Sequence, residues 1–357
     1  MADTTHVPLR SAAISQFIDG VYGLVNPQVG TTRQGKPYLK CILRDASGEM
    51  PGRKWDFPEA DLGALSATGF VRVAGGVESY DDRAQLRIER IHSVEVADED
   101  LARLLPVARR DPAAMDARLR EILGTLAHPG MRALVEEYLA DDELMARFRR
   151  APAAVTLHHA WIGGLLEHTL QLVELADRML PLYPLLSRDL VLAGLFLHDI
   201  GKVFELSWER GFNYTVDGNL IGHIVRGAIL LQAKAARVRQ RIGEELPADA
   251  IKVLQHIILS HHGRPEHGAA RMPSTPEAIF VASLDHLDAR TQMALSATRE
   301  EGAPDAGGAL FTDRLWALET RLYRPDPLAA SMEAPATAAA PPPEPAVDAQ
   351  RGPDGAT

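Results

Sequence analysis

The residues with the clearest chemical potential are His198 and Asp199, which end the apolar run Val191–Leu197. That run is long enough for about two turns of buried helix. Burying an imidazole and a carboxylate at the end of so apolar an element is costly unless each finds a strong partner. A metal ion is the strongest partner available. Gly201 follows at the expected position of a C-terminal helix cap, and Lys202 places a cation beside the pair.

Histidines are concentrated in one part of the chain, since ten of the thirteen lie between His158 and His286. Imidazoles or carboxylates recur on five separate apolar segments that we expect to be helices: His168, His198 with Asp199, His223, His261 with His262, and Asp285. Such a set without cysteine suits Mn²⁺, Fe²⁺, Mg²⁺ or Zn²⁺ at an open catalytic site. Six ligands exceed the need of one catalytic ion, which favours two ions about 4 Å apart, bridged by one carboxylate.

Two bridged ions indicate the hydrolysis of a phosphate ester. They lower the pKa of a water molecule between them and stabilise the charge that builds on a phosphoryl oxygen. Two roles for Lys202 are compatible with the sequence. It either holds a phosphate oxygen or serves as an ordinary cation at a helix C-terminus.

The composition limits the class of protein. The 357 residues carry a net charge of −10, so contact with nucleic acid requires a local basic patch. Cys41 is the only cysteine, which excludes an intramolecular disulfide and a cysteine-based zinc site. With no membrane-spanning run and no secretory signal at the N-terminus, we expect a cytoplasmic protein that does not bind membranes. The sequence is also compatible with a homo-oligomer.

Residues 11–97 are expected to form a small β-barrel, with an OB-fold as the natural candidate. Strands are predicted over Gly20–Val25, Gly35–Arg44, Met50–Trp55, Phe70–Gly75 and Gln85–Ile91, with a connection at Asn26-Pro27 after the first. In the second strand, alternation directs Leu39, Cys41 and Leu43 toward a core.

A basic patch accompanies these strands. Residues 33–54 hold six basic and two acidic side chains, and aromatic residues are interleaved with them. Stacking aromatics beside cations are typical of a groove for single-stranded nucleic acid. We therefore predict a substrate-binding surface, against the alternative of a solvated strand face, from Tyr38, Lys40, Arg44 and Trp55.

The rest of the chain is expected to be helical up to its tail. Residues 98–150 are interpreted as a helical connector, with a breaker at Asp111-Pro112 and one pattern running from Leu134 to Phe148. Residues 151–322 hold the histidines and form an all-α domain. Residues 325–357 contain eight of the twenty-four prolines and no aromatic residue, so we expect a disordered Pro/Ala-rich tail.

The order of these motifs resembles the HD superfamily of metal-dependent phosphohydrolases, with Leu197–Lys202 as its signature. More narrowly, the chain is similar to the YhaM-type 3′–5′ exoribonucleases, which place an OB-fold before the HD domain. The stretches that carry this resemblance are His158-His159-Ala160, Gly163–Thr169, Gly222-His223-Ile224, Leu259–Gly263 and Asp285–Arg290.

The resemblance implies roles for single residues. One ion is held by His168, His198, Asp199 and Asp285, and Asp199 bridges to a second ion completed by His223 and His261. Between the two adjacent histidines, we predict His261 as the ligand and His262 as a substrate contact. His158 and His159 are expected either to contact phosphate or to be structural. Asp199 and Lys202 are the predicted catalytic residues, and Mn²⁺ is the expected metal.

Three functions from different classes follow. The leading hypothesis is a 3′–5′ exoribonuclease whose barrel captures single-stranded RNA or DNA and whose HD domain removes nucleotides. The second is an HD phosphohydrolase of a small nucleotide. The third is a nucleic-acid-binding or scaffolding protein with an inactive HD domain, although a purely structural role does not need an open dinuclear site.

Overall fold

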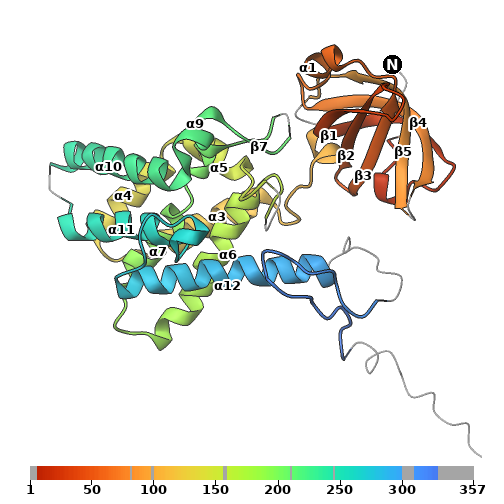
Figure 1. Cartoon of the computed structure of the whole chain (residues 1–357). Helices are drawn as coiled ribbons and strands as arrows, with labels where there is room; N and C mark the ends of the chain where they lie inside the picture. The colour runs from red at the N-terminus through yellow and green to blue at the C-terminus, as the bar shows by residue number, and fades with distance from the viewer. Residues whose placement is uncertain are drawn as a thin grey trace, which may run out of the picture. The chain divides into compact units, whose positions relative to one another are not determined.

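The computed structural model describes residues 6–80, 83–97, 100–155, 159–209, 211–243, 246–299 and 309–328 (Figure 1). The chain divides into two compact units, residues 1–296 and residues 297–357. Within the described ranges, no helix combines the length and apolar character that crossing a bilayer requires.

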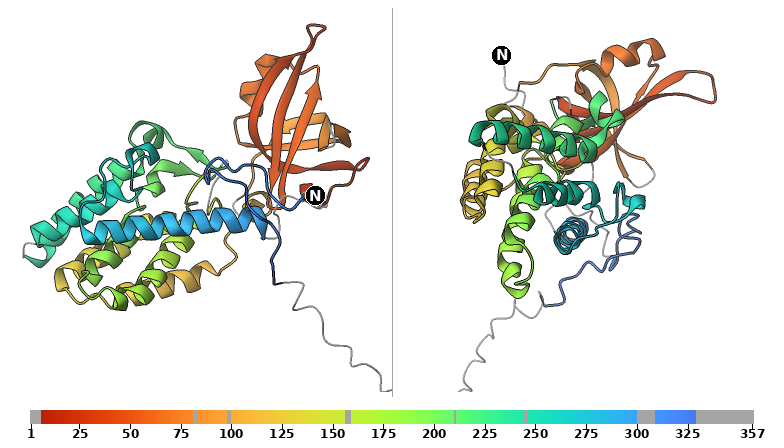
Figure 2. Two further views of the ribbon diagram at one scale, coloured as in Figure 1. Left: turned by 60° about the horizontal axis from the view of Figure 1, so that its bottom comes forward. Right: turned by 90° about the vertical axis from the view of Figure 1, so that its left-hand side faces the viewer.

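A closed five-stranded barrel occupies the N-terminal part of the first unit (Figure 2). Its strand order, β1-β2-β3-β5-β4, is that of an OB-fold, which confirms the predicted fold of this part. The strands are β1 (Phe17–Thr31), β2 (Pro37–Asp45), β3 (Gly48–Trp55), β4 (Phe70–Tyr80) and β5 (Arg83–Ser93), with the short helices η1 (Leu9–Ser11), η2 (Glu59–Asp61) and α1 (Leu62–Leu65). The buried side chains of Leu39, Cys41 and Leu43 enter its core, as the alternation predicts.

The predicted connection at Asn26-Pro27 is wrong. These residues lie inside β1, which is much longer than the predicted Gly20–Val25. The register with β2 shifts between Val25 and Gln28, and Asn26 has a positive φ of 48°. A β-bulge thus absorbs both residues, because a bulge tolerates the missing N–H of proline and the turn-like backbone of Asn26.

Helices make up nearly all of the remaining first unit. They are α2 (Leu101–Leu104), α3 (Pro112–Leu123), α4 (Pro129–Leu139), α5 (Asp142–Arg150), α6 (Gly164–Met179), η4 (Leu180–Leu182), α7 (Arg188–Leu197), α8 (Lys202–Glu205), α9 (Val216–Leu220), α10 (Gly222–Ile242), α11 (Ala248–Ser260), η5 (Pro265–His267) and α12 (Pro276–Thr298). The strands β6 (Leu206–Ser207) and β7 (Asn213–Tyr214) form a small ladder among them.

The helices α3, α4 and α5, which fall in the predicted connector, share one hydrophobic core with α6, α7, α10 and α11. The single helix expected from Leu134 to Phe148 is two helices. Asp141 separates them because its side chain accepts a hydrogen bond from the Leu144 amide and caps α5. At the predicted breaker, Asp111 caps α3 in the same way and Pro112 is its first residue.

The apolar run that precedes the His-Asp pair forms α7, and Val191–Leu197 is buried on every side. Gly201 is not the predicted C-terminal cap, since its φ of −64° is right-handed and it precedes α8. Its role is a close approach of two backbones. A Cβ atom on Gly201 would lie 2.1 Å from the carbonyl oxygen of His223, so only glycine lets the start of α10 pack here.

In the second unit, α12 ends at Thr298, and the described residues 309–328 contain no helix, although helix was expected up to residue 322. Antiparallel bridges join Phe311 to Tyr323 and Leu315 to Thr320, which gives a small hairpin-like fold. Of the tail predicted to be disordered, the structure describes residues 325–328, and residues 329–357 lie outside the described residues.

The Gly201 contact gives a first testable prediction. Gly201→Ala should destabilise the protein by at least about 1–3 kcal/mol, the usual cost of overpacking, because the new methyl group meets backbone that cannot rotate away. Thermal unfolding measures the change. Gly63→Ala is the matched control, because Gly63 in α1 faces open space and alanine there should be neutral or slightly stabilising. Equal stability of the two variants would contradict the close approach.

Candidate metal centre

The predicted ligands come together at helix ends in the middle of the helical part. His198 and Asp199 directly follow α7, and His168 lies in the second turn of α6. His223 opens α10, His261 and His262 follow α11, and Asp285 lies on α12. Three groups of side chains each place their nitrogen or oxygen atoms within 4.8 Å of one another: Asp199, His223, His261 and His262; His168, His198 and Asp285; and His159, His168 and Asp288.

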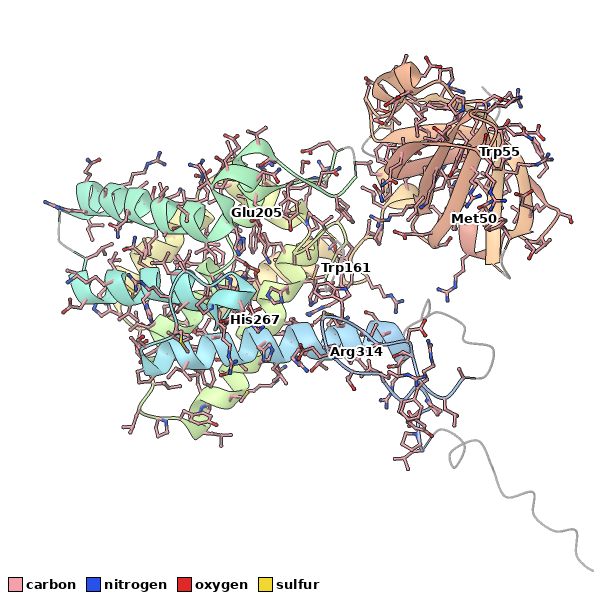
Figure 3. All side chains as sticks on the ribbon, in the orientation of Figure 1. Met50, Trp55, Trp161, Glu205, His267 and Arg314 are labelled. Carbon is pink, nitrogen blue, oxygen red and sulfur yellow. The ribbon has the colours of Figure 1, made fainter. Side chains whose placement is uncertain are left out.

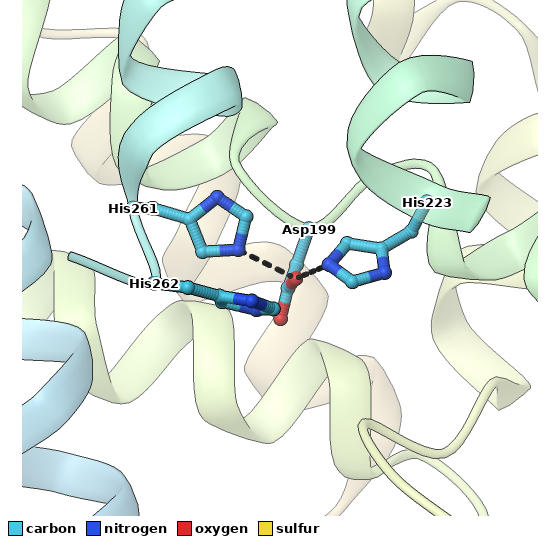
Figure 4. A group of neighbouring side chains, drawn as sticks. All are labelled: Asp199, His223, His261 and His262. Atoms are coloured by element: carbon cyan, nitrogen blue, oxygen red, sulfur yellow. Dashed lines mark ion pairs between the residues drawn. The ribbon is translucent and has the colours of Figure 1, made fainter. Parts of the chain in front are cut away.

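Asp199 links the first two groups because its two oxygens face opposite sides. Oδ2 lies 3.4 Å from His198 Nε2 and 3.8 Å from His168 Nε2. Oδ1 lies 3.5 Å from His223 Nε2 and 3.4 Å from His261 Nε2, and Figure 4 shows these two rings approaching it from opposite directions. The carboxylate therefore has the geometry of a bridging ligand.

The second ring nitrogen of each predicted histidine ligand is already engaged. His198 Nδ1 lies 2.7 Å from the Leu195 carbonyl, and His261 Nδ1 lies 2.9 Å from the Ile258 carbonyl. A carbonyl only accepts, so both Nδ1 atoms carry the proton and both Nε2 lone pairs point inward. His223 Nδ1 is held in the same way by Glu205, at 2.9 Å.

His168 has the most elaborate support, and two of the residues that provide it, Asp288 and Gln171, were given no role from the sequence. Its Nδ1 lies 2.8 Å from Asp288 Oδ2, which also contacts His159 Nε2 at 3.1 Å. Gln171 donates to the other Asp288 oxygen. A carboxylate behind a histidine is the usual second shell of a metal ligand. Two features of the sequence could have pointed to Asp288: it lies one helical turn after Asp285, and it belongs to the stretch Asp285–Arg290 that carries the family resemblance.

Several buried polar atoms at this place have no hydrogen-bond partner among the described residues: Asp199 Oδ1, His223 Nε2, His261 Nε2 and His262 Nδ1. Each such atom costs roughly 1–3 kcal/mol if it stays unsatisfied. The inward-facing nitrogen lone pairs and the carboxylate oxygen can all bind a cation, whereas they cannot hydrogen-bond to one another because none of these atoms carries a proton. The clusters therefore fit divalent metal binding, and the donor set of imidazole and carboxylate suits a transition metal.

Electrostatics around the centre point the same way. Burial alone lowers the pKa of His168, but its hydrogen bonds to Asp285 and Asp288 outweigh burial and raise that pKa to about 9. Burial raises the pKa of Asp199, yet Lys202 and His198 more than offset it and hold the pKa well below its ordinary value. The Asp199 carboxylate is thus ionised, and its negative charge is stabilised by positive charge nearby, such as that of Lys202 or of a bound cation.

Lys202 is the first residue of the four-residue helix α8, which closely follows the His198-Asp199 pair. Its Nζ lies 2.7 Å from Asp199 Oδ2. Burial lowers the pKa of Lys202, but the adjacent Asp199 outweighs burial and the pKa is raised. The ammonium group is therefore a permanent charge at the edge of the centre.

Comparison with known proteins agrees with this geometry. Residues 165–290 match the HD domain family. The 3′–5′ exoribonuclease YhaM of Geobacillus sp. (strain WCH70) is 33% identical over 301 residues, which cover 83% of this chain and 88% of the relative. The protein of the same name from Bacillus pumilus (strain SAFR-032) is 33% identical over 301 residues, covering 83% and 91%. The chain belongs to the YhaM family of 3′–5′ exoribonucleases.

A solved structure matches the barrel of this YhaM family member. It is the second OB-fold domain of replication protein A from Methanococcus maripaludis, with 18% identity, 24% of this chain and 89% of that chain covered, and a TM-score of 0.19. The fold of the barrel is established by its own closed strand order.

The predicted substrate-binding residues of this family member share the outer face of β2 and β3. The cross-strand pairs there are Tyr38 with Trp55, Lys40 with Arg53, and Arg44 with Glu49. The rings of Tyr38 and Trp55 lie 5.2 Å apart, and Trp55 is 43% exposed. Figure 3 labels Trp55 on this side of the barrel, with Met50 farther along β3.

Two details of this face were not foreseen. Arg44 forms an ion pair with Glu49, so its charge is partly neutralised. Arg53 lies on the same face, and its guanidinium stacks over the Tyr80 ring at 4.6 Å. Arg53 could have been predicted to lie on this face, because it is two residues from Trp55 and side chains two residues apart on a strand point to the same side.

The remaining predicted contacts are the histidines next to the ligands. His158 lies outside the described residues. His159 is 1% exposed and faces Asp288, which places it behind His168. His262 stands beside His261 with a ring-centroid distance of 4.3 Å. Burial, together with nearby His261 and His223, lowers the pKa of His262 to about 3, so its imidazole is neutral.

The support of His168 gives a second prediction. Asp288→Asn should weaken metal binding by about 10–100-fold, the usual effect of losing a second-shell carboxylate, while circular dichroism keeps the helical signal. Calorimetric titration of the full chain with Mn²⁺ measures the affinity. Asp249→Asn on α11 is the control, because its side chain is 94% exposed and should leave affinity unchanged. Equal affinity of the two variants would remove Asp288 from the centre.

Proposed function

We propose that this chain is a metal-dependent 3′–5′ exoribonuclease that hydrolyses the phosphodiester bonds of single-stranded RNA in the cytoplasm. The observation that carries the proposal is the position of Asp199, whose two oxygens face two separate histidine groups. The relatives are exoribonucleases, which supports RNA as the polymer.

In this proposal one divalent ion would be held by His168, His198, Asp199 and Asp285. A second would be held by His223, His261 and the same Asp199, and Mn²⁺ is the proposed metal at both positions. His261 is the better ligand of the adjacent pair, because its Nδ1 is engaged by Ile258 and its Nε2 faces Asp199. His262 is left for the substrate.

Two bound ions supply an activated water molecule and charge stabilisation for the phosphoryl group. The protein supplies the rest. Asp199 fixes the spacing of the two positions, and the engaged Nδ1 atoms prevent the histidine rings from turning. Lys202 keeps one N–H on Asp199 and has further donors for a non-bridging phosphate oxygen. The buried apolar helix α7 keeps bulk water away from one side of the site.

We assign capture of the strand to the barrel, residues 11–97. Tyr38 and Trp55 provide stacking surfaces, and Lys40 and Arg53 are cations on the same face. Among the described residues neither cation forms an ion pair, so both are available to phosphates, and Arg44 is held by Glu49. Stacking and phosphate contacts tolerate any sequence, which suits a degradative enzyme.

The decisive test of this function uses oligoribonucleotides labelled at either end, incubated with the full chain and Mn²⁺. The expected result is stepwise shortening from the 3′ end, with loss of activity in excess chelator. Asp199→Ala should lower turnover by more than about 100-fold, the scale of losing one key electrostatic group, with circular dichroism unchanged. Shortening from the 5′ end, or full activity in chelator, would refute the proposal.

The barrel gives a separate prediction. Tyr38→Ala with Trp55→Ala should weaken binding of a long oligoribonucleotide at least about tenfold, because each stacked base contributes roughly 1–3 kcal/mol. Hydrolysis of a small chromogenic phosphodiester should not change. Tyr214→Ala, which removes a comparably exposed tyrosine from the helical part, is the control. Equal loss on polymer and small substrate would mean that the barrel residues only support the fold.

A further inference from the structure

A second feature lies directly beside the metal centre. A pocket of about 410 Å³ opens between the loop after α11 and the first half of α12. Its lining includes His262, Arg264, His267, Met272, Ile279 and His286. His262 also belongs to the metal cluster, and His286 follows Asp285 directly. The pocket therefore begins where the proposed metal positions end, and its volume lies in the range of small-molecule sites.

The walls of the pocket combine apolar and flat aromatic surface. Met272 is 60% exposed and Ile279 is 55% exposed, so both present apolar side-chain surface to the pocket that they line. The rings of His267 and His286 lie nearly parallel, at an interplanar angle of 23° and a centroid distance of 6.4 Å. Figure 3 shows His267 beside α12. Such walls suit a planar heterocycle, since histidine faces stack on nucleobases.

A cation completes the lining. The side chain of Arg264 is exposed and forms no ion pair or hydrogen bond with any described residue. The loop that carries it is shaped by Gly268, whose φ is +100°. A Cβ atom there would lie 3.2 Å from His262 Nδ1, so glycine leaves room for the His262 ring.

We propose that this pocket binds the nucleoside at the 3′ end of the strand, the one that hydrolysis releases as a nucleoside 5′-monophosphate. The proposal rests on the proposed function. The 5′-phosphate of that nucleoside lies at the metal centre, and Arg264 faces the negative charge of this phosphate. The base packs against Ile279 and Met272 and stacks on His286 or His267. Because stacking and apolar contact carry the recognition, all four bases are accepted.

The test compares two small substrates on the full chain with Mn²⁺: the p-nitrophenyl ester of uridine 5′-monophosphate and bis(p-nitrophenyl) phosphate. Only the first carries a nucleoside. Ile279→Trp, which fills the pocket, and Arg264→Ala should each raise KM for the nucleoside ester, by about tenfold for the tryptophan variant. Both should leave kcat/KM for the other ester within about twofold. Equilibrium dialysis should show the same loss for uridine 5′-monophosphate itself.

Matched controls are available nearby. Ile229→Trp alters an equally exposed isoleucine on α10, and Arg271→Ala removes another arginine from the loop region, neither of them lining the pocket. Both should behave as wild type on both esters. The proposal is overturned if pocket and control variants act alike on the nucleoside ester, or if the pocket variants lose both esters equally.

The outcome separates this proposal from the one on which it rests. An unmodified chain that cleaves the nucleoside ester with pocket-dependent KM, but does not shorten labelled RNA from its 3′ end, would refute the exoribonuclease and retain a nucleoside 5′-phosphate site. A chain that shortens RNA from the 3′ end, with pocket variants indistinguishable from wild type, would retain the exoribonuclease and refute the pocket.

Discussion

A buried carboxylate is the constraint on which the helical part of this protein depends. Asp199 is 2% exposed, and a charge in such a place costs several kcal/mol unless it is compensated. Lys202 compensates it on one oxygen only, so the histidines on the other side are needed as well. These come from α10 and α11, while α6 contributes His168 on the first side. Four helices must therefore begin or end around one point, and the fully buried α7 fixes where that point lies.

The same requirement explains why many of the surrounding residues fix the orientation of the histidine rings. A histidine whose Nδ1 is engaged by a carbonyl or a carboxylate can rotate neither its ring nor its proton, so its Nε2 is already aimed before any ion arrives. Glu205 does this for His223, and Asp288 does it for His168. Gly201 serves the same purpose through the backbone, because a side chain there would push the start of α10, and with it His223, away from Asp199.

Much of the centre could be predicted from the sequence, because each ligand lies within or at the end of an apolar segment, where an unpaired polar group is conspicuous. Its supports could not. Glu205 and Asp288 look like ordinary helix residues until folding places them behind a histidine. In the barrel, strict alternation of apolar and polar residues identified the buried side chains of β2. Asn26-Pro27 was wrongly predicted as a connection, because the same residue types occur in turns and in β-bulges. The split at Asp141 was missed because the apolar spacing continues across it, and only the cap reveals the new helix.

The position of His262 shows how a centre of this kind is made selective for a chain end. Two ions bridged by a carboxylate act on phosphodiesters in general, and nothing in the ligand set distinguishes a terminal bond from an internal one. Discrimination must come from what lies beyond the reacting phosphate. Next to His262 lies a pocket of limited volume, with apolar and aromatic walls and one arginine that pairs with no described residue. A space that accepts a single nucleoside and does not read its base makes the last bond of any strand the one that is cut, while sequence-tolerant stacking on the barrel holds the strand.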